Sequence, residues 1–230
     1  MSKKTVVITG SSRGIGRACA ILFAKNNYNV VINYNKSKEL AEELFNDLKE
    51  AGYSVDIFKA DISNRFEANS LINHCIGKFG KIDVLINNAG ISQNKLFTDI
   101  TDDDWNEMMG TNLNGIFYTT QKALQYMLPE CSGKIINIAS MLSFQGGKFV
   151  PPYTASKHGV AGLTKAFANE LAAYNVQINA IAPGYIETAN TAPIRADENR
   201  NKEILSRIPC ERWGRVEDLM GTVVFLASKA

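Results

Sequence analysis

Short apolar runs rich in Val and Ile alternate along the chain with longer segments in which apolar residues recur every three or four positions. The short runs predict buried strands and the longer segments predict amphipathic helices. The expected strands span residues 5–9, 29–34, 54–59, 81–87, 133–138 and 177–182. The expected helices span residues 17–25, 37–51, 63–77 with Ser63 as cap, 102–127 with a break near Gly110 or Gly115, 153–174 and 216–227. Strands separated by helices imply right-handed crossovers and a parallel sheet covered on both faces, an α/β fold.

Residues 185–212 interrupt this alternation. The stretch is polar and contains Pro193 and Pro209, which favours an insertion or lid over a site. No repeat, linker or low-complexity tract divides the chain. We therefore expect a single domain over residues 1–230, with 185–212 as its lid.

A glycine-rich turn joins the first expected strand to the first helix. It reads Gly10-Ser-Ser-Arg-Gly14-Ile-Gly16. Glycines allow the backbone to turn tightly and to approach a pyrophosphate, and the N-terminus of the following helix attracts that anion. Alone, the motif also fits an ordinary strand-to-helix turn.

Tyr153 and Lys157 lie four positions apart, so a helix places them on the same face. A fixed positive charge near a phenol favours the phenolate and lowers the tyrosine pKa, which would allow proton transfer near neutral pH. The spacing alone also fits a packed ring and a solvated amine.

The composition of the chain limits the kinds of partner that it is expected to bind. The 230 residues are 45% hydrophobic with a net charge of +2, so a sizeable core is expected and neither a nucleic-acid surface nor a membrane surface is. The partner should be a small molecule. No signal peptide or transmembrane stretch is evident. Scattered cysteines without ligand spacing indicate free thiols in the cytoplasm and no metal site: Cys19, Cys75, Cys131 and Cys210.

Together these motifs resemble the short-chain dehydrogenase/reductase family over nearly the whole chain. Besides the glycine turn, Asn87-Asn-Ala-Gly90 and Pro183-Gly184 with Thr188 match family motifs. The family's catalytic set falls on Asn112, Ser140, Tyr153 and Lys157. The resemblance implies a Rossmann-type, doubly wound sheet and hydride transfer between a nicotinamide and a carbonyl carbon.

The resemblance also implies a role for each catalytic residue. Tyr153 would be the general acid, Ser140 a hydrogen-bond donor to the reacting oxygen, and Lys157 both the group that depresses the tyrosine pKa and a ligand of the nicotinamide ribose. Asn112 would hold a water that continues the proton path. Taken singly, Ser140 also fits a strand-end cap and Asn112 a polar residue within a helix.

The cofactor expected is NADP, with NAD as the alternative. The second strand ends at Tyr34 with no acid for a ribose 2′-hydroxyl, and Arg13 suits a 2′-phosphate, although it also fits a solvated turn. Asp61 and Ile62 resemble the adenine contacts, and a turn or cap explains Asp61 as well. The full expected set is Gly10, Ser12, Arg13, Gly14, Ile15, Gly16, Tyr34, Asp61, Ile62, Asn88, Ala89, Gly90, Tyr153, Lys157, Pro183, Gly184, Ile186 and Thr188.

The two halves of the chain point to different substrates. Up to about residue 137 the sequence looks like 3-oxoacyl-acyl-carrier-protein reductases. From Ile138 onward it looks like 2-deoxy-D-gluconate 3-dehydrogenases, a pattern that fits natural divergence or a composite sequence. Because the second half builds the pocket, we expect a keto sugar acid, with 3-oxoacyl reduction as one alternative and a non-catalytic dinucleotide-binding module as another. The expected substrate contacts are Ser140, Gln145 and Arg195, with Lys148 and Arg200 as further candidates.

One feature departs from the family pattern. Relatives continue past the last helix through another strand and a Gly-rich tail, whereas this sequence stops at Ala230. The sheet is therefore expected to end before the family's last strand. A homo-oligomer, a tetramer or dimer, is expected from the resemblance.

Overall fold

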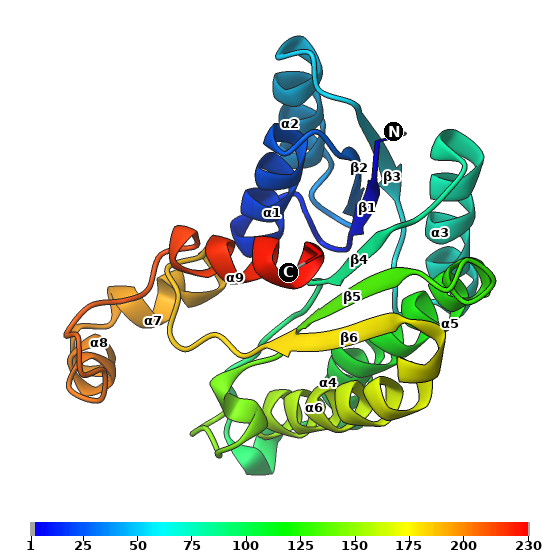
Figure 1. Ribbon diagram of the computed structural model, residues 1–230. Helices are drawn as coiled ribbons and strands as arrows, with labels where there is room; N and C mark the ends of the chain where they lie inside the picture. The colour runs from blue at the N-terminus through cyan, green and yellow to red at the C-terminus, as the bar shows by residue number, and fades with distance from the viewer. Residues whose placement is uncertain (1–2, 230) are drawn as a thin grey trace.

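The computed structural model describes residues 3–229, whose strands form one parallel sheet in the order β3-β2-β1-β4-β5-β6 (Figure 1). The strands are β1 (Thr5–Ile8), β2 (Asn29–Tyr34), β3 (Val55–Lys59), β4 (Val84–Asn87), β5 (Gly133–Ile138) and β6 (Val176–Ile181). The strand order reverses between β1 and β4, where Val6 lies between Val30 and Val84. The doubly wound Rossmann-type fold is therefore confirmed, and its switch point places a crevice at the carboxyl ends of β1 and β4.

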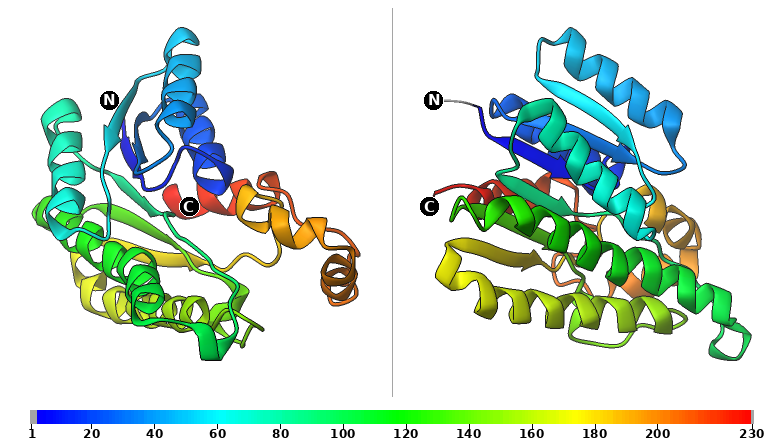
Figure 2. Two further views of the ribbon diagram at one scale, coloured as in Figure 1. Left: turned by 180° about the vertical axis from the view of Figure 1, so that it is seen from behind. Right: turned by 90° about the vertical axis from the view of Figure 1, so that its right-hand side faces the viewer.

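Helices cover both faces of the sheet. One face packs against α1 (Gly14–Lys25), α2 (Lys38–Glu50) and α9 (Glu217–Ala227), and the other against α3 (Arg65–Phe79), α5 (Gly115–Met127) and α6 (Pro151–Leu171) (Figure 2). Successive side chains of β1 show why helices must pack on both faces of the sheet. Val6 and Ile8 belong to the first core and Val7 to the second, and all three are fully buried.

The expected long helix 102–127 is interrupted, as the glycines suggested. It consists of α4 (Asp102–Met109), a π-helical turn (Gly110–Asn114) and α5. A Cβ on Gly115 would lie 2.6 Å from Cδ1 of Ile62, so only glycine lets this helix approach the loop after β3 so closely. The extra residue of the π-turn points Asn112 into the protein, where it is fully buried.

Several expected boundaries are different in the structure. Asn64, and not Ser63, caps α3 by accepting hydrogen bonds from the backbone N–H groups of Phe66 and Glu67. The Ser63 hydroxyl donates to Asp61 instead. The helix expected at 153–174 begins at Pro151 and ends at Leu171, and β4 begins three residues later than expected, at Val84.

Residues 185–212 leave the sheet at the carboxyl end of β6. They contain the short helices α7 (Ala192–Ala196) and α8 (Glu198–Leu205), which Figure 1 shows to one side of the sheet, beyond the strand ends. The stretch is anchored by an isolated parallel bridge between Ile186 and Gly214, and by the Trp213 indole, which donates to Oδ1 of Asn201 at 2.7 Å. Among residues 3–229, no helix is long and apolar enough to cross a membrane.

A buried polar network links the middle of the sheet to two helices. The Asn87 amide donates to Oδ1 of Asn137 at 2.9 Å and to Oγ1 of Thr120 at 3.0 Å. The Asn137 amide donates in turn to Oγ1 of Thr164 on α6 at 3.0 Å. Such a network stabilises the fold only while each member keeps its partner, because an unpaired buried polar group is costly.

We expect Thr164→Val to lower the free energy of unfolding by about 1–3 kcal/mol, because it leaves one Asn137 amide hydrogen without an acceptor. Thr98→Val is the matched control, since the exposed Thr98 hydroxyl donates to Oδ1 of Asp99 and has no other hydrogen bond within residues 3–229. Urea unfolding of both variants measures the difference. Equal stability of the two variants would contradict the network's role.

Candidate active site

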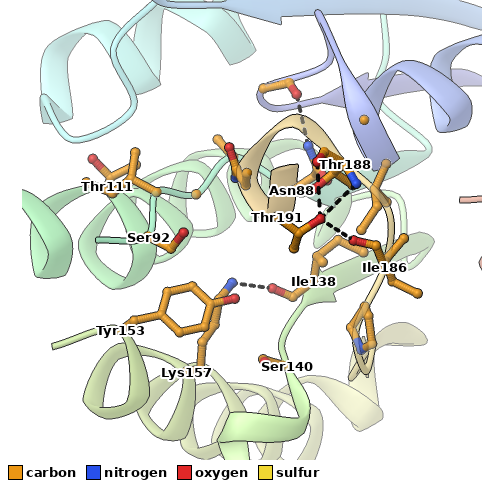
Figure 3. Close-up of a pocket in the computed structure, with 18 of the residues that line it drawn as sticks. Asn88, Ser92, Thr111, Ile138, Ser140, Tyr153, Lys157, Ile186, Thr188 and Thr191 are labelled. Carbon is orange, nitrogen blue, oxygen red and sulfur yellow. Dashed lines mark hydrogen bonds between the residues drawn. The ribbon is translucent and has the colours of Figure 1, made fainter. Parts of the chain in front are cut away.

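A cavity of about 450 Å³ opens at the carboxyl ends of the strands. Its walls come from the glycine turn after β1, the ends of β2, β4 and β5, the first turns of α6, and the segment around α7 and α8. Figure 3 shows Tyr153, Lys157 and Ser140 on one side of this cavity and Asn88, Thr188 and Thr191 on another. Most of the predicted cofactor, catalytic and substrate residues thus converge here, although they are far apart in the sequence.

The glycine turn has the shape that a phosphate needs. Gly10 and Gly14 adopt φ values of +61° and +56°, which side chains disfavour. A Cβ on Gly10 would lie 2.8 Å from Cα of Ala89. The first turn of α1 contains no acidic residue, so its free N–H groups face the cavity without a competing carboxylate. A dinucleotide pyrophosphate fits this cradle.

Gly16, the last glycine of the motif, lies behind the turn. It does not line the cavity. A Cβ there would lie 2.5 Å from both Nδ2 of Asn88 and the Gly10 carbonyl oxygen. Gly16 therefore allows α1 to pack against the ends of β1 and β4, and its expected contact with the cofactor stays a prediction.

Two buried polar residues hold the turn in place. The Thr9 hydroxyl accepts hydrogen bonds from the backbone N–H groups of Asn88 and Ala89, at 2.9 and 3.0 Å. Asn33, which the sequence analysis missed, accepts from the Gly10 N–H at 3.0 Å and donates to the Ala60 carbonyl at 3.1 Å. An amide inside an otherwise apolar strand was the signal available for Asn33, because such a group needs partners.

Lys157 is the buried cation of the site. Only 3% of the residue is exposed, and its ammonium donates to the Ile138 carbonyl at 2.7 Å, 5.6 Å from the centre of the Tyr153 ring (Figure 3). Burial disfavours the charged form and lowers the pKa of Lys157 to about 8. The group is still mostly protonated at neutral pH.

The pKa of Tyr153 differs from the expectation. The adjacent ammonium was expected to depress it, but burial raises the tyrosine pKa above its usual value. A hydrogen bond with the Ser140 hydroxyl acts in the opposite direction. Desolvation of the phenolate therefore dominates, and Tyr153 is a protonated acid at neutral pH.

Ser140 is placed by the start of a short 3₁₀ turn (Met141–Ser143) directly after β5. Its hydroxyl oxygen accepts from the Leu142 N–H at 3.1 Å, which is the cap that the residue type suggested. The hydroxyl also lines the cavity on the side of Tyr153. The Ser143 hydroxyl donates to the Lys157 carbonyl at 2.7 Å and so ties this turn to α6.

Asn112 does not line the cavity. Its carboxamide accepts from the Ile91 N–H at 2.8 Å and donates to the Ile91 carbonyl at 2.9 Å. The same amide donates to the Ser156 hydroxyl at 3.2 Å. The side chain therefore links the loop after β4 to α6, and the expected part in a proton path stays a prediction.

The end of the cavity beside β2 carries charged groups of both signs. Tyr34, the last residue of β2, and Lys36 just after the strand line it, and Arg13 lines it from the glycine turn. Asp61 and Ile62 also line the cavity. Burial acts to raise the pKa of Asp61. Hydrogen bonds from Ser63 and Asn35, together with the positive charge of Lys36, outweigh burial, and the pKa is lowered.

The expected contacts on the nicotinamide side also reach the cavity. This wall includes Pro183, Gly184, Ile186 and Thr188. Thr191 fixes the loop that carries them, because its hydroxyl donates to the Ile186 carbonyl at 2.8 Å and accepts from the Thr188 N–H at 3.0 Å (Figure 3).

Of the expected substrate contacts, Ser140 and Gln145 line the cavity and Arg195 does not. The Arg195 guanidinium lies 6.0 Å from the centre of the Trp213 ring and donates to the Thr188 carbonyl at 3.4 Å. Its position suits support of the cofactor-side loop. Lys148 and Arg200, the further candidates, both line the cavity.

Comparison with known proteins agrees with this geometry. The chain is 46% identical over 235 residues to 2-dehydro-3-deoxy-D-gluconate 5-dehydrogenase of Bacillus subtilis, covering 99% of this chain and 88% of that protein. It is 40% identical to a 3-oxoacyl-acyl-carrier-protein reductase of Staphylococcus aureus, covering 98% of this chain and 91% of that protein.

A gluconate 5-dehydrogenase from Burkholderia cenocepacia, solved in complex with NADP and tartrate, superimposes with a TM-score of 0.93. It is 34% identical, and the match covers 99% of this chain and 89% of that one. The family model for short chain dehydrogenases matches residues 4–199. By its fold, its cavity and these matches, the chain belongs to the short-chain dehydrogenase family.

Proposed function

We propose that the protein is an NADP-dependent oxidoreductase that interconverts a ketone and a secondary alcohol on a keto sugar acid. One observation carries the reaction: Ser140, Tyr153 and Lys157 line one side of a single cavity whose other end is a phosphate cradle. The substrate class is supported by the 46% identity to an enzyme that is named for a keto sugar acid.

In the reductive direction each of these side chains has a distinct task. NADPH, when bound, supplies the hydride. Tyr153, protonated at neutral pH, can give its proton to the carbonyl oxygen, and the Ser140 hydroxyl can donate a hydrogen bond to the same oxygen. The Lys157 ammonium stabilises the phenolate that remains, because the two groups share a site of low polarity.

Reduction of a 3-oxoacyl thioester is the second candidate, supported by the 40% identity to the Staphylococcus aureus enzyme. The test is the loss of NADPH or NADH absorbance with a panel of keto sugar acids and a 3-oxoacyl thioester. Turnover of a keto sugar acid supports the proposal, and turnover of the thioester alone rejects it. NADPH binding without any turnover would favour a non-catalytic dinucleotide-binding module.

We also propose that residues 185–212 act as the lid of this site within a single domain. Ile194, Arg200, Ile204 and Arg207 from this stretch line the cavity. Lys148 bridges the lid to the loop before α6 through an ion pair with Glu203 at 3.1 Å.

A homo-oligomer, either dimer or tetramer, belongs to the proposal too. A shallow apolar hollow on the outer faces of α5 and α6 includes Leu113, Phe117 and Leu163, and a second copy could cover it. Light scattering of the purified protein tests this, and a monomer at micromolar concentration would reject it.

The proposed location is the cytoplasm. All four cysteines are free thiols, with Cys19 and Cys75 buried and Cys131 and Cys210 exposed, which suits a reducing compartment. Cell fractionation tests this part of the proposal.

We expect Tyr153→Phe to lower kcat about 10²- to 10⁴-fold, because the ring stays in place while the proton donor is lost. The Kd for NADPH should change little. Tyr174→Phe is the matched control, since Tyr174 is 48% exposed just after the far end of α6. Retention of full activity by Tyr153→Phe would rule out the proposed acid.

Replacement of the buried ammonium should change stability in a pH-dependent way. The folded pKa of Lys157, about 8, lies below the unfolded value of about 10.4, so the unfolded state binds more protons between these values. The wild type should therefore become more stable relative to the Lys157→Met variant as the pH rises through this window. The difference between their free energies of unfolding should change by about 2 kcal/mol between pH 7 and pH 10. Urea unfolding of both proteins measures this, and parallel pH profiles would contradict it. Activity of Lys157→Met should be lost throughout.

Arg13→Met should raise the KM for NADPH about 10-fold and leave the KM for NADH unchanged, because the guanidinium suits the 2′-phosphate that only NADPH carries. Arg17→Met is the control, since the Arg17 guanidinium pairs with Glu43 at 3.0 Å and Asp47 at 3.3 Å instead. An equal rise in both KM values for Arg13→Met would indicate a role of the turn in general phosphate binding.

A further inference from the structure

One face of α8 and the turn after it forms the lid wall of the cavity. Arg200, Glu203, Ile204 and Arg207 follow one another at helical spacing, and the Arg207 N–H donates to the Ile204 carbonyl at 3.0 Å to continue the turn. Ile204 is 1% exposed and lines the cavity together with Arg200 and Arg207. This wall therefore combines one buried apolar contact with two cations.

Two of the cations near this wall already share a carboxylate. Glu203 pairs with Nη1 of Arg200 at 2.5 Å and with Nζ of Lys148 at 3.1 Å. Hydrogen bonds from Arg200 and Lys148 lower the pKa of Glu203, so it stays ionised at neutral pH. Recruiting either cation to a ligand would break an existing ion pair, and the bridge is better suited to holding α8 against the loop before α6.

Arg207 has no such partner. Among residues 3–229 no carboxylate forms an ion pair with its guanidinium, yet it lines the cavity. Within the same described residues Arg195 also lacks a carboxylate partner, but it lies against Trp213 outside the cavity. Arg13 and Lys36 lie at the other end, beside β2.

The Glu203 bridge indicates which part of the cavity Arg207 faces. Lys148, at one end of the bridge, lies in the loop directly before α6, and Tyr153 lies in the first turn of that helix. Helix α8 is therefore held over the end of the cavity where the carbonyl would react. Arg207 lies one helical turn beyond Glu203, on the same wall.

We propose that Arg207 binds the carboxylate of the substrate, while the bridge from Lys148 through Glu203 to Arg200 positions the helix that presents it. The planar guanidinium can give two parallel hydrogen bonds to one carboxylate, which fixes the acid end of a short hydroxy or keto acid. The assignment rests on the proposed sugar acid function. It makes Arg207 a determinant of specificity for acids over neutral sugars.

The test compares Arg207→Met with Lys202→Met, a control on an exposed residue of α8 that does not line the cavity. Calorimetric titration with D-gluconate in the presence of NADPH measures binding without turnover, and D-glucitol is the uncharged counterpart. We expect Arg207→Met to raise the Kd for gluconate about 10- to 100-fold and to leave the values for glucitol and NADPH unchanged. Arg207→Lys should retain part of the affinity, since it keeps the charge and loses the fork.

Kinetics separate the failure of this assignment from the failure of the proposed function. If the wild type turns over a keto sugar acid, Arg207→Met should raise KM for it more than it lowers kcat, and equal KM values overturn the role of Arg207 alone. If the wild type turns over no keto sugar acid, the proposed function fails. The gluconate titration then decides whether Arg207 binds a carboxylate. Weaker gluconate binding by Arg207→Met than by the wild type supports this role, whereas equal binding by the two proteins, or no binding by the wild type, overturns it.

Discussion

The active site depends on a charged ammonium held in an almost fully buried position. Lys157 has one backbone partner at the end of β5, the Ile138 carbonyl, and little solvent to compensate for its burial. Its position on α6 is fixed by the Ser143 hydroxyl, which donates to the Lys157 carbonyl, and by the hydrogen bond to the end of β5. Because the same burial raises the pKa of Tyr153, the acid and its stabilising charge come from one arrangement of helix and sheet.

The cofactor end depends on contacts between strand ends. The glycine turn after β1 is held by Asn33 from β2 and by the segment after β4, to which Thr9 bonds. Parallel strands bring all these carboxyl ends to one edge, so three segments that are distant in the sequence become one wall. The residues expected to contact the cofactor are thus held in place by buried polar side chains such as Thr9 and Asn33.

The arginines of the lid show how the same residue type acquires different roles. Arg195 packs on Trp213, Arg200 pairs with Glu203, and Arg207 faces the cavity without a carboxylate partner among the described residues. All three lie in the polar stretch 185–212. Their difference comes from the direction of α7 and α8, which is set by the anchors at Ile186 and Trp213.

The sequence by itself determined the sheet, its helices and the main chemistry. Apolar periodicity located the strands of the described residues within a few residues, and local spacing placed the glycine turn and put Tyr153 and Lys157 on one helix face, because such spacing reflects backbone geometry. Ser140, and the catalytic roles of Tyr153 and Lys157, were indicated by the resemblance to the family. Only the tertiary structure decided the pKa direction of Tyr153, the packing role of Gly16 and the choice among the lid arginines. Burial and ion pairing depend on which distant segments meet, and one-dimensional spacing does not carry that information.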